Sequence, residues 1–550
     1  MSGRGTGHQG RVLGLWFAVV LCLLIGIFPI LSPRAPSGDD PDAISVERAL
    51  EHVDFIAREP HVMGTPEIER VREYLIETLT ETGLEPEKLT IEAPDYFGVS
   101  GGTVDIVDVL VRIRGSGDGR AILLMAHYDT VPTTSGANDN SAAVAALLEV
   151  ARILAAEPPP PNDVIVLFTD GEEPTPRFGA WGFAEYHPWF HDVALAVNLE
   201  GIAVAGPTML VEMSGPKREL LSRLANAVPD PVAYSFMTQT ADLIGGAATD
   251  FDVFRDRGVP GYNFTYMRGT SIYHTPRDSI ANLNVDGLAH HGSIVLGIAR
   301  YFGSPDVGGA GADDTVFFTV PFRFVVRYST TIAIASLVVA LLVLVGALRA
   351  RITRRGSSVR ALVSGLGAVL LAAFVSVVTA TLLWFGLVSL RPEMSMIEGY
   401  VCLAALVGLI GGAWYLTQRR SVLRGKDAAG GVLIVWFVLT LLVGSLLPTF
   451  GYLFVWPAIA VGVAEIVMAR SNSVWLRFGS VVVVALTTSV VLVPAVDIFF
   501  LLSSPRPGNP DSEMPVTIVL PLVLSFLAIG LIATRVSTPT TTGSKPQGAV

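Results

Sequence analysis

The sequence predicts an α/β domain joined to a helical region that spans a membrane. Between about residues 45 and 303, short apolar runs suited to buried strands alternate with helical segments. Long apolar blocks occupy the N-terminus and the C-terminal third, and they raise the hydrophobic content to 51%. Alternating strands and helices favour a mostly parallel sheet covered on both faces. The long blocks favour an all-α, multi-span transmembrane region.

The first apolar block covers residues 12–32 and follows a short N-terminus, residues 1–11, that carries Arg4 and Arg11. About 20 apolar residues are enough to cross a bilayer. A cleavable signal peptide is the alternative, but its apolar region is usually about 7–15 residues long and precedes a small-residue cleavage site. The sequence FPILSPRAPSG has no convincing site of this kind. We therefore expect an uncleaved anchor, a cytoplasmic N-terminus and a proline-rich linker at residues 33–44.

The domain over residues 45–303 contains two predicted helices and five predicted strands. A helix over residues 140–157 ends at four consecutive prolines, and a shorter helix covers residues 182–190. The strands are expected at residues 121–127, 163–170, 194–200, 209–214 and 261–266. Ligands of open α/β sheets gather at the carboxyl ends of the strands. Polar residues at those ends are therefore candidates for one common site.

A linker at residues 304–328 leads to a predicted seven-span region, residues 329–534, and a tail, residues 535–550. Glu465 and Asp497 lie near predicted span ends, where a charged side chain can reach the interface. We therefore interpret this region as an anchor or scaffold. The spans are expected near residues 330–348, 362–389, 399–417, 430–448, 451–468, 479–502 and 516–533.

The loops between these spans predict the orientation of the chain. Those at residues 349–360 and 418–427 are strongly basic, whereas those at residues 391–398 and 503–515 are not. Cytoplasmic loops carry the excess of Lys and Arg. Both termini are therefore expected in the cytoplasm, and the α/β domain is expected on the other side of the membrane.

Charge and cysteine content exclude two classes of site. The net charge of −11 argues against nucleic acid, which proteins bind with clustered basic residues. The two cysteines, Cys22 and Cys402, both lie in apolar blocks. The sequence therefore predicts neither a disulfide framework nor a thiolate metal site.

Several carboxylates and two imidazoles lie at or near the predicted strand ends or in the loops beside them. Each has an ordinary explanation by itself, such as a helix cap or a surface polar residue. Their order and spacing together favour a hydrolytic metal site, because zinc accepts imidazole and carboxylate ligands. The side chains are those of His127, Asp129, Asp139, Glu172, Glu173, Glu200 and His274.

These residues stand in motifs that resemble the M28 zinc aminopeptidases. The motifs are AHYDTVPTTSGANDNSAA, VLFTDGEEPTPRFGAWGF, VNLEG and YHTPRDS, and the resemblance covers most of residues 45–303. An anchor, a peptidase domain and a multi-span tail in this order resemble the endoplasmic-reticulum metallopeptidase and vacuolar membrane protease branch. The resemblance implies a three-layer α/β/α fold with a mixed sheet and two zinc ions per chain.

The resemblance also implies which side chains would bind each of the two zinc ions. Asp139 would bridge the two ions, His127 and Glu200 would complete one site, and Glu173 and His274 would complete the other. A cis peptide bond is implied between Asp139 and the next residue, Asn140. Many soluble members carry Asp at the position of Glu200, and the membrane branch is similar to this chain in carrying Glu.

Two further residues receive catalytic roles from the resemblance. Glu172 would be the general base that takes a proton from water. Asp129 would accept the second N–H of His127 and fix its tautomer. The walls of the substrate pocket are expected in residues 228–258 and 266–273, where Phe251, Phe254 and Tyr266 are either pocket or core residues.

The sequence thus predicts a membrane-anchored di-zinc metallopeptidase, specifically an aminopeptidase for peptides or proteins outside the cytoplasm. A single-zinc cyclase-like or carboxypeptidase activity stays open, as does an inert peptidase-like receptor or scaffold. Arginine outnumbers lysine, and Ala, Gly and Val are abundant, which is typical of a GC-rich bacterial genome. The expected location is then the bacterial cytoplasmic membrane, or the endoplasmic reticulum or vacuole for a eukaryotic source. Side-chain specificity and oligomeric state are not predicted.

Overall fold

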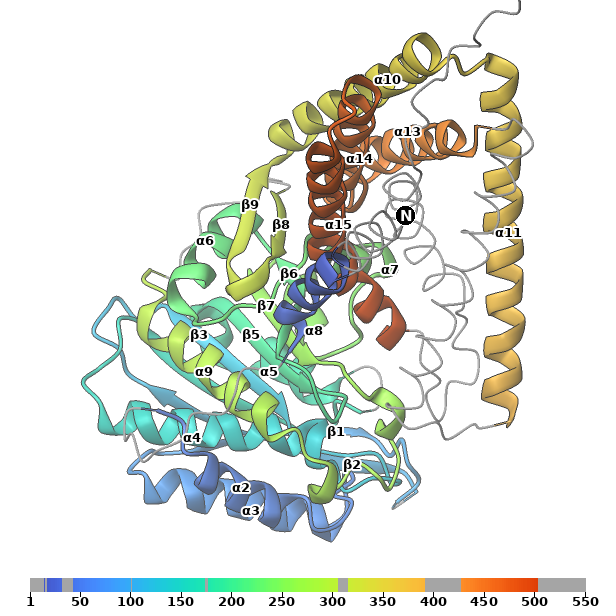
Figure 1. Ribbon diagram of the computed structural model, residues 1–550. Helices are drawn as coiled ribbons and strands as arrows, with labels where there is room; N and C mark the ends of the chain where they lie inside the picture. Colours follow the sequence, from blue (N-terminus) through green and yellow to red (C-terminus); the bar gives the residue numbers. More distant parts are fainter. Residues whose placement is uncertain are drawn as a thin grey trace, which may run out of the picture.

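The chain folds into an α/β domain and a group of long helices that pack against it (Figure 1). The computed structural model describes residues 14, 17–31, 43–99, 101–173, 177–304, 315–390 and 427–502. The long helices lie at one edge of the α/β domain. The sheet and the helices around it determine the position of the candidate site.

A seven-stranded mixed sheet forms the centre of the α/β domain, with the order β1-β2-β4-β3-β5-β7-β6. The four strands β4, β3, β5 and β7 run parallel, and the remaining strands join antiparallel at the two edges. The predicted mixed, mostly parallel arrangement is therefore confirmed in the centre of the sheet. The strands are β1 (Glu87–Pro94), β2 (Thr103–Ile113), β3 (Ala121–His127), β4 (Asp163–Thr169), β5 (Val193–Gly201), β6 (Met209–Ser214) and β7 (Gly261–Tyr266).

Helices cover both faces of this sheet. On one face, Leu124 of β3 and Val166 of β4 share an apolar core with α2 (Val46–Ile56), α3 (Pro66–Glu81), α4 (Ala142–Ala156), α6 (Lys217–Ala227) and α9 (Val285–Tyr301). On the other face, Leu123 and Leu167 pack with α5 (Phe178–Tyr186) and α8 (Phe251–Asp256). Central strands covered on both sides have no solvent-facing row. This explains why their sequences are continuously apolar, and it confirms the three-layer α/β/α fold.

Strands β1 and β2 were not among the predicted elements. β1 is an edge strand with the sequence EKLTIEAP, and most of its side chains are exposed or partly exposed. It therefore lacks the apolar run that identifies a buried strand. The segment expected as a linker, residues 304–328, contains most of an antiparallel hairpin of β8 (Thr315–Thr319) and β9 (Val325–Ser329). Phe317 and Phe318 of β8 are buried.

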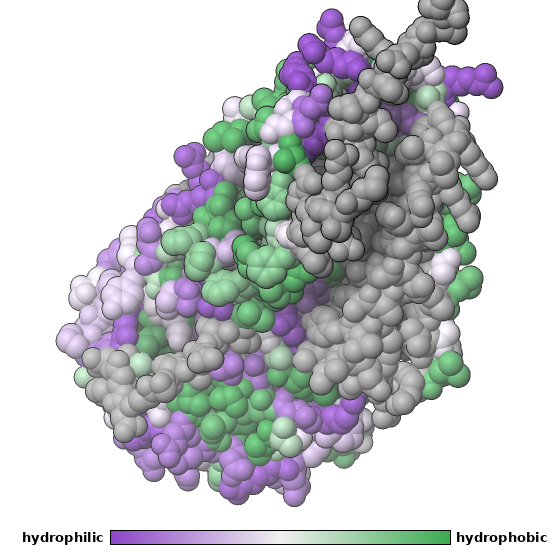
Figure 2. Space-filling view, viewed as in Figure 1, coloured by the Kyte–Doolittle hydropathy of each residue, from purple (hydrophilic) through white to green (hydrophobic). Residues whose placement is uncertain are grey.

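Four of the described helices are long and apolar enough to cross a membrane. They are α10 (Thr330–Arg355), α13 (Ala428–Leu446), α14 (Tyr452–Arg470) and the part of α15 (Val474–Leu502) that ends at Ile498. Further apolar helical stretches lie at Val359–Val375 within α11 (Val359–Leu390) and at Phe17–Ile27 near the N-terminus. The predicted spans near 399–417 and 516–533 lie outside the described residues. Figure 2 shows predominantly hydrophobic residues over these helices and hydrophilic residues at their far end.

The two ends of the helices have different partners. At the end next to the α/β domain, Asp497 of α15 accepts a hydrogen bond from Arg268, and Trp456 of α14 donates one to Tyr328. At the far end, the buried Arg351 of α10 pairs with Asp427 and Glu465. Both charged residues that the sequence placed near span ends, Glu465 and Asp497, are therefore paired.

Candidate functional site

The site residues meet at the carboxyl ends of the parallel strands. His127 is the last residue of β3, Glu200 is the second-last residue of β5, and Glu172 and Glu173 follow β4. Asp139 lies in the short helical turn η2 (Ala137–Ser141) before α4, and the peptide bond from Asp139 to Asn140 is cis. Neighbouring parallel strands end at the same edge of a sheet, so residues far apart in sequence come together there.

One oxygen of Asp139 faces the first of two clusters. Its Oδ1 lies 3.4 Å from Nε2 of His127, and the same nitrogen lies 3.4 Å from Oε2 of Glu200. All three side chains are buried. Amides hold the Glu200 carboxylate in place, because Asn198 Nδ2 donates to Oε1 at 2.9 Å and Asn140 Nδ2 donates to Oε2 at 3.3 Å.

The other oxygen of Asp139 faces the second cluster. Its Oδ2 lies 3.3 Å from Nε2 of His274, and this nitrogen lies 3.0 Å from Oε2 of Glu173. His274 follows η4 (Thr270–Ile272) and has a φ of 57°, in the left-handed region. The Asp139 carboxylate therefore stands between two imidazole–carboxylate pairs.

These two clusters fit metal ions. Asp139 Oδ2, Glu173 Oε1 and His274 Nε2 are buried and have no hydrogen-bond partner in the described structure. Buried polar atoms normally have partners, so three such orphaned atoms side by side fit a metal site. Donors bound at about 2.0–2.1 Å to a tetrahedral zinc ion lie about 3.3–3.4 Å apart. The distances around both histidines are close to that value.

The charges of the two clusters act on each other strongly. Burial alone would raise the pKa of Asp139, but the neighbouring imidazoles of His127 and His274 lower it to about 2. Burial would lower the pKa of His274, yet Asp139 and Glu173 raise it to about 10. Burial and the charge of Asp139 raise the pKa of Glu173 to about 7. The site thus concentrates negative charge that a proton or a metal cation neutralises.

Asp129 has a different set of partners from the one expected. The backbone carbonyl of Asp129 lies 3.0 Å from Nδ1 of His127, whereas its carboxylate Oδ1 lies 3.5 Å away. The carboxylate accepts the backbone N–H groups of Glu172 at 3.1 Å and Glu173 at 3.2 Å. Asp129 therefore contacts the first histidine through its backbone and orients the two glutamates through its side chain.

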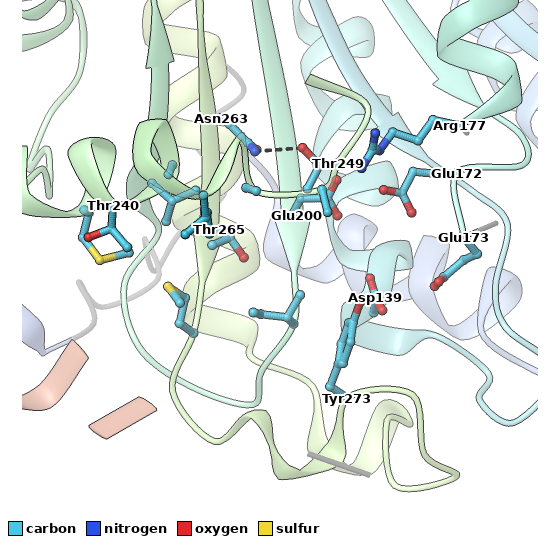
Figure 3. Close-up of a pocket in the computed structure, with 18 of the residues that line it drawn as sticks. Asp139, Glu172, Glu173, Arg177, Glu200, Thr240, Thr249, Asn263, Thr265 and Tyr273 are labelled. Carbon is cyan, nitrogen blue, oxygen red and sulfur yellow. Dashed lines mark hydrogen bonds between the residues drawn. The ribbon is translucent and has the colours of Figure 1, made fainter. Parts of the chain in front are cut away.

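The Glu172 side chain lines the cavity beside these clusters. Burial raises its pKa well above the usual value for a glutamate, although the charge of His127 opposes this shift. A carboxylate with a raised pKa is a stronger proton acceptor when ionised, which suits general-base catalysis near neutral pH. In Figure 3, Glu172 and Glu173 lie on the same side of the cavity as Asp139.

Asp278 is a site residue that sequence reasoning missed. Its Oδ1 accepts the backbone N–H of Asn138 at 2.8 Å, and its Oδ2 accepts that of Asp139 at 3.1 Å. The side chain is buried, and burial together with the charge of Asp139 raises its pKa to about 6. Asp278 lies in the motif YHTPRDS, but the motif does not reveal which backbone groups its carboxylate accepts.

A cavity of about 380 Å³ extends from the two clusters to an apolar wall (Figure 3). Residues of both expected segments, 228–258 and 266–273, line it. The three aromatic candidates Phe251, Phe254 and Tyr266 are fully buried and belong to the core, so the pocket alternative for them is wrong. The apolar lining includes Ile202, Val211, Met237, Ala241, Ile244 and Met267.

Comparisons with known proteins identify the domain. Residues 108–299 match the family model described as "Peptidase family M28". This match places the α/β domain in peptidase family M28. This is a family of zinc metallopeptidases, and the chain also has membrane helices.

Two relatives of this M28 chain have names that refer to membranes or organelles. The chain is 26% identical over 357 residues to "Endoplasmic reticulum metallopeptidase 1" of Homo sapiens, covering 60% of this chain and 39% of the relative. It is 28% identical over 282 residues to "Vacuolar membrane protease" of Candida dubliniensis, covering 48% of this chain and 29% of the relative. The chain thus spans less than half the length of these curated relatives.

Solved structures are similar at lower identity. An aminopeptidase from Aneurinibacillus sp. strain AM-1 is 14% identical, with a TM-score of 0.39, and the match covers 48% of this chain and 95% of that one. A Porphyromonas gingivalis glutaminyl cyclase is 19% identical, with a TM-score of 0.37, and the match covers 46% and 97%.

Proposed function

We propose that the chain is a membrane-anchored di-zinc aminopeptidase that hydrolyses peptides on the non-cytoplasmic side of the membrane. The observation that carries this proposal is the division of the Asp139 carboxylate between two clusters, one with His127 and one with His274. A bridging carboxylate offsets the repulsion between two cations about 3.5–4 Å apart. The three orphaned atoms in the second cluster support a metal there as well.

Each side chain has a role in this proposal. His127 and Glu200 would hold one zinc ion, Glu173 and His274 the other, and Asp139 both. Bound zinc supplies Lewis-acid chemistry and lowers the pKa of water. Glu172 would take a proton from water and return it to the leaving amine. Asp129, through its bonds to the backbone of Glu172 and Glu173, would hold both glutamates in position.

Tyr273 is a candidate for stabilising the negative charge that develops on the substrate carbonyl. It lines the cavity next to His274 and stacks on that imidazole with ring centroids 3.7 Å apart. Burial and the nearby carboxylates raise its pKa well above 10, so the phenol keeps its proton at neutral pH. A fixed O–H donor beside the reacting carbonyl would favour the transition state.

The pairing of the arginine that lines the cavity disfavours a substrate bound by its carboxyl terminus. Four carboxylates line the cavity, those of Glu172, Glu173, Glu200 and Asp139. Arg177 lines it too, but Asp252 lies 3.3 Å from the guanidinium. A carboxypeptidase needs a cation for the terminal carboxylate of its substrate. Three of the four carboxylates would bind the zinc ions, so it is the pairing of Arg177 with Asp252 that disfavours a carboxypeptidase.

The position of basic residues at one end of the helices supports the proposed orientation. The α/β domain contacts the helix ends near Trp456 and Asp497, whereas the basic Arg351 and Arg355 lie at the other end of α10. Basic residues mark the cytoplasmic side. The peptidase domain would therefore face away from the cytoplasm.

The test uses the full chain in detergent, with zinc content and hydrolysis of leucyl-nitroanilide measured in the same sample. We expect about two zinc ions per chain, chelator-sensitive activity and no hydrolysis when the amino group is acetylated. Glu172→Gln should keep both zinc ions and lower kcat by about 10²–10⁴-fold, the usual contribution of a general base. One zinc without hydrolysis would favour a cyclase-like enzyme, and a folded chain without metal would favour an inert scaffold. Full activity of Glu172→Gln would refute its role as base.

A further inference from the structure

The apolar wall of the cavity is formed by α7 (Ser235–Ile244) and the segments beside it. Met237, Ala241 and Ile244 come from α7, Val211 comes from β6, and Met267 follows β7. Figure 3 shows Thr240 of α7 at the end of the cavity away from Asp139 and Glu173. An apolar wall opposite the reacting groups suits an apolar side chain of the substrate.

The turn between α13 and α14 holds α7. Ser235 Oγ donates a hydrogen bond to the backbone carbonyl of Thr449 at 2.6 Å, and Thr449 Oγ1 donates to Oε1 of Gln239. Between these two contacts, the ring of Phe236 packs edge-on against Phe450, with centroids 5.8 Å apart. Three contacts along the first turns of α7 therefore come from a loop of the transmembrane region.

Asp497 of α15 holds the opposite segment of the wall. Its Oδ2 accepts a hydrogen bond from Arg268 Nη2 at 2.8 Å, and both side chains are largely buried. The backbone of Arg268 pairs with Ala205 in both directions, at 2.9 and 3.0 Å. Arg268 directly follows the wall residue Met267. Asp497 of the membrane helix α15 therefore contacts the residue next to Met267, and Met267 is part of the wall.

The apolar packing is continuous from the wall into the helices. Met237 and Met267 belong to the same core cluster as Leu337 of α10, Trp436 of α13 and Leu453 of α14. The core clusters on the two faces of the sheet, by contrast, are built within the α/β domain and its hairpin. The wall is therefore packed between the α/β domain and the membrane region, whereas the clusters behind the metal-ligand edge lie within the α/β domain.

We infer that the transmembrane helices set the side-chain specificity of this peptidase. The turn around Thr449 and the carboxylate of Asp497 position the wall that receives a large apolar side chain of the N-terminal substrate residue. This inference rests on the proposed aminopeptidase function. Thr449, Asp497 and Arg268 are positioning residues, because they act through α7 and Met267.

Asp497→Asn in the full chain tests this inference, with leucyl- and alanyl-nitroanilides as substrates. The variant should raise KM for the leucyl substrate about tenfold, within the range that apolar pockets provide for side-chain discrimination. KM for the alanyl substrate, kcat for both and the zinc content should stay within about twofold of wild type. Asp497→Glu, which restores a carboxylate, should recover most of the leucyl KM.

The matched control is Glu465→Gln. It removes one carboxylate of a buried ion pair at the far end of the helices, 2.7 Å from Arg351, and it should leave both KM values unchanged. Ser235→Ala, which removes the bond to the Thr449 carbonyl, provides a second test and should raise the leucyl KM selectively.

Different failures have different meanings. If wild type hydrolyses neither substrate, the proposed function fails and this inference falls with it. If wild type is active but Asp497→Asn and Ser235→Ala change both substrates alike, only the inference is refuted. An equal change in Glu465→Gln would also refute it, because the effect would then reflect general loosening of the helices.

Discussion

The two ends of the cavity are built in different ways. At the metal-ligand edge, His127 and Glu200 stand at or near the ends of parallel strands, and the chain around Asp139 is held by Asp278. At the apolar wall, α7 and Met267 are held by the turn around Thr449 and by Asp497. The first end depends on the sheet, and the second depends on the membrane helices. Changes at one end should therefore leave the function of the other intact.

The largest effect should come from Asp139→Ala. Because this carboxylate faces both clusters, its removal should abolish binding at both metals and reduce hydrolysis to the background rate. Zinc measured by mass spectrometry and hydrolysis of leucyl-nitroanilide in the same sample would check this. Glu219→Gln on α6, which breaks the Glu219–Arg223 ion pair outside the cavity lining, is the control. Two retained zinc ions would contradict the bridging role.

A smaller effect should follow Asp278→Asn. The amide presents one oxygen and one N–H donor group, so one of the backbone N–H groups of Asn138 and Asp139 would lose its acceptor. We expect metal affinity to fall about 10–100-fold, as is usual for residues that orient ligands. A competition titration with a chromogenic chelator would measure it. The ratio of leucyl to alanyl kcat/KM in the zinc-loaded enzyme should not change, and a change in that ratio would mean that the two ends are coupled.

The last expected effect, which needs no substitution, is the dependence of metal affinity on pH. His274 has a pKa of about 10 and Glu173 one of about 7, and both must be deprotonated to bind metal. Metal binding therefore releases protons, and affinity should rise with pH by up to about tenfold per unit for each proton released. Chelator competition at pH 6, 7 and 8 would check the sign. Affinity that is constant or falls with pH would contradict it.

The apolar wall provides the matching control for this pH series. Its residues Val211, Met237 and Met267 do not titrate. The preference for leucyl over alanyl substrate should therefore stay constant between pH 6 and 8, while metal affinity changes.

The elements and residues that could be predicted from the sequence are those whose position follows from a short stretch of the chain. Continuous apolar runs identified β3, β4 and β5, because strands covered on both faces have no polar row. Parallel strands end at one edge, so His127, Glu172 and Glu200 were expected to lie together there. The edge strand β1 has no such run, and it was not found.

Only the tertiary structure decided the contacts between segments far apart in the chain. Asp278 reaches the backbone at Asp139, and Asp497 reaches Arg268, across 139 and 229 positions of sequence. Periodicity and motif spacing describe which face a residue occupies, and they carry no information about which distant group its side chain meets. The sequence by itself therefore determined the fold class, the membrane helices and the candidate ligands. The packing of those helices against α7 decided which part of the molecule forms the wall of the cavity.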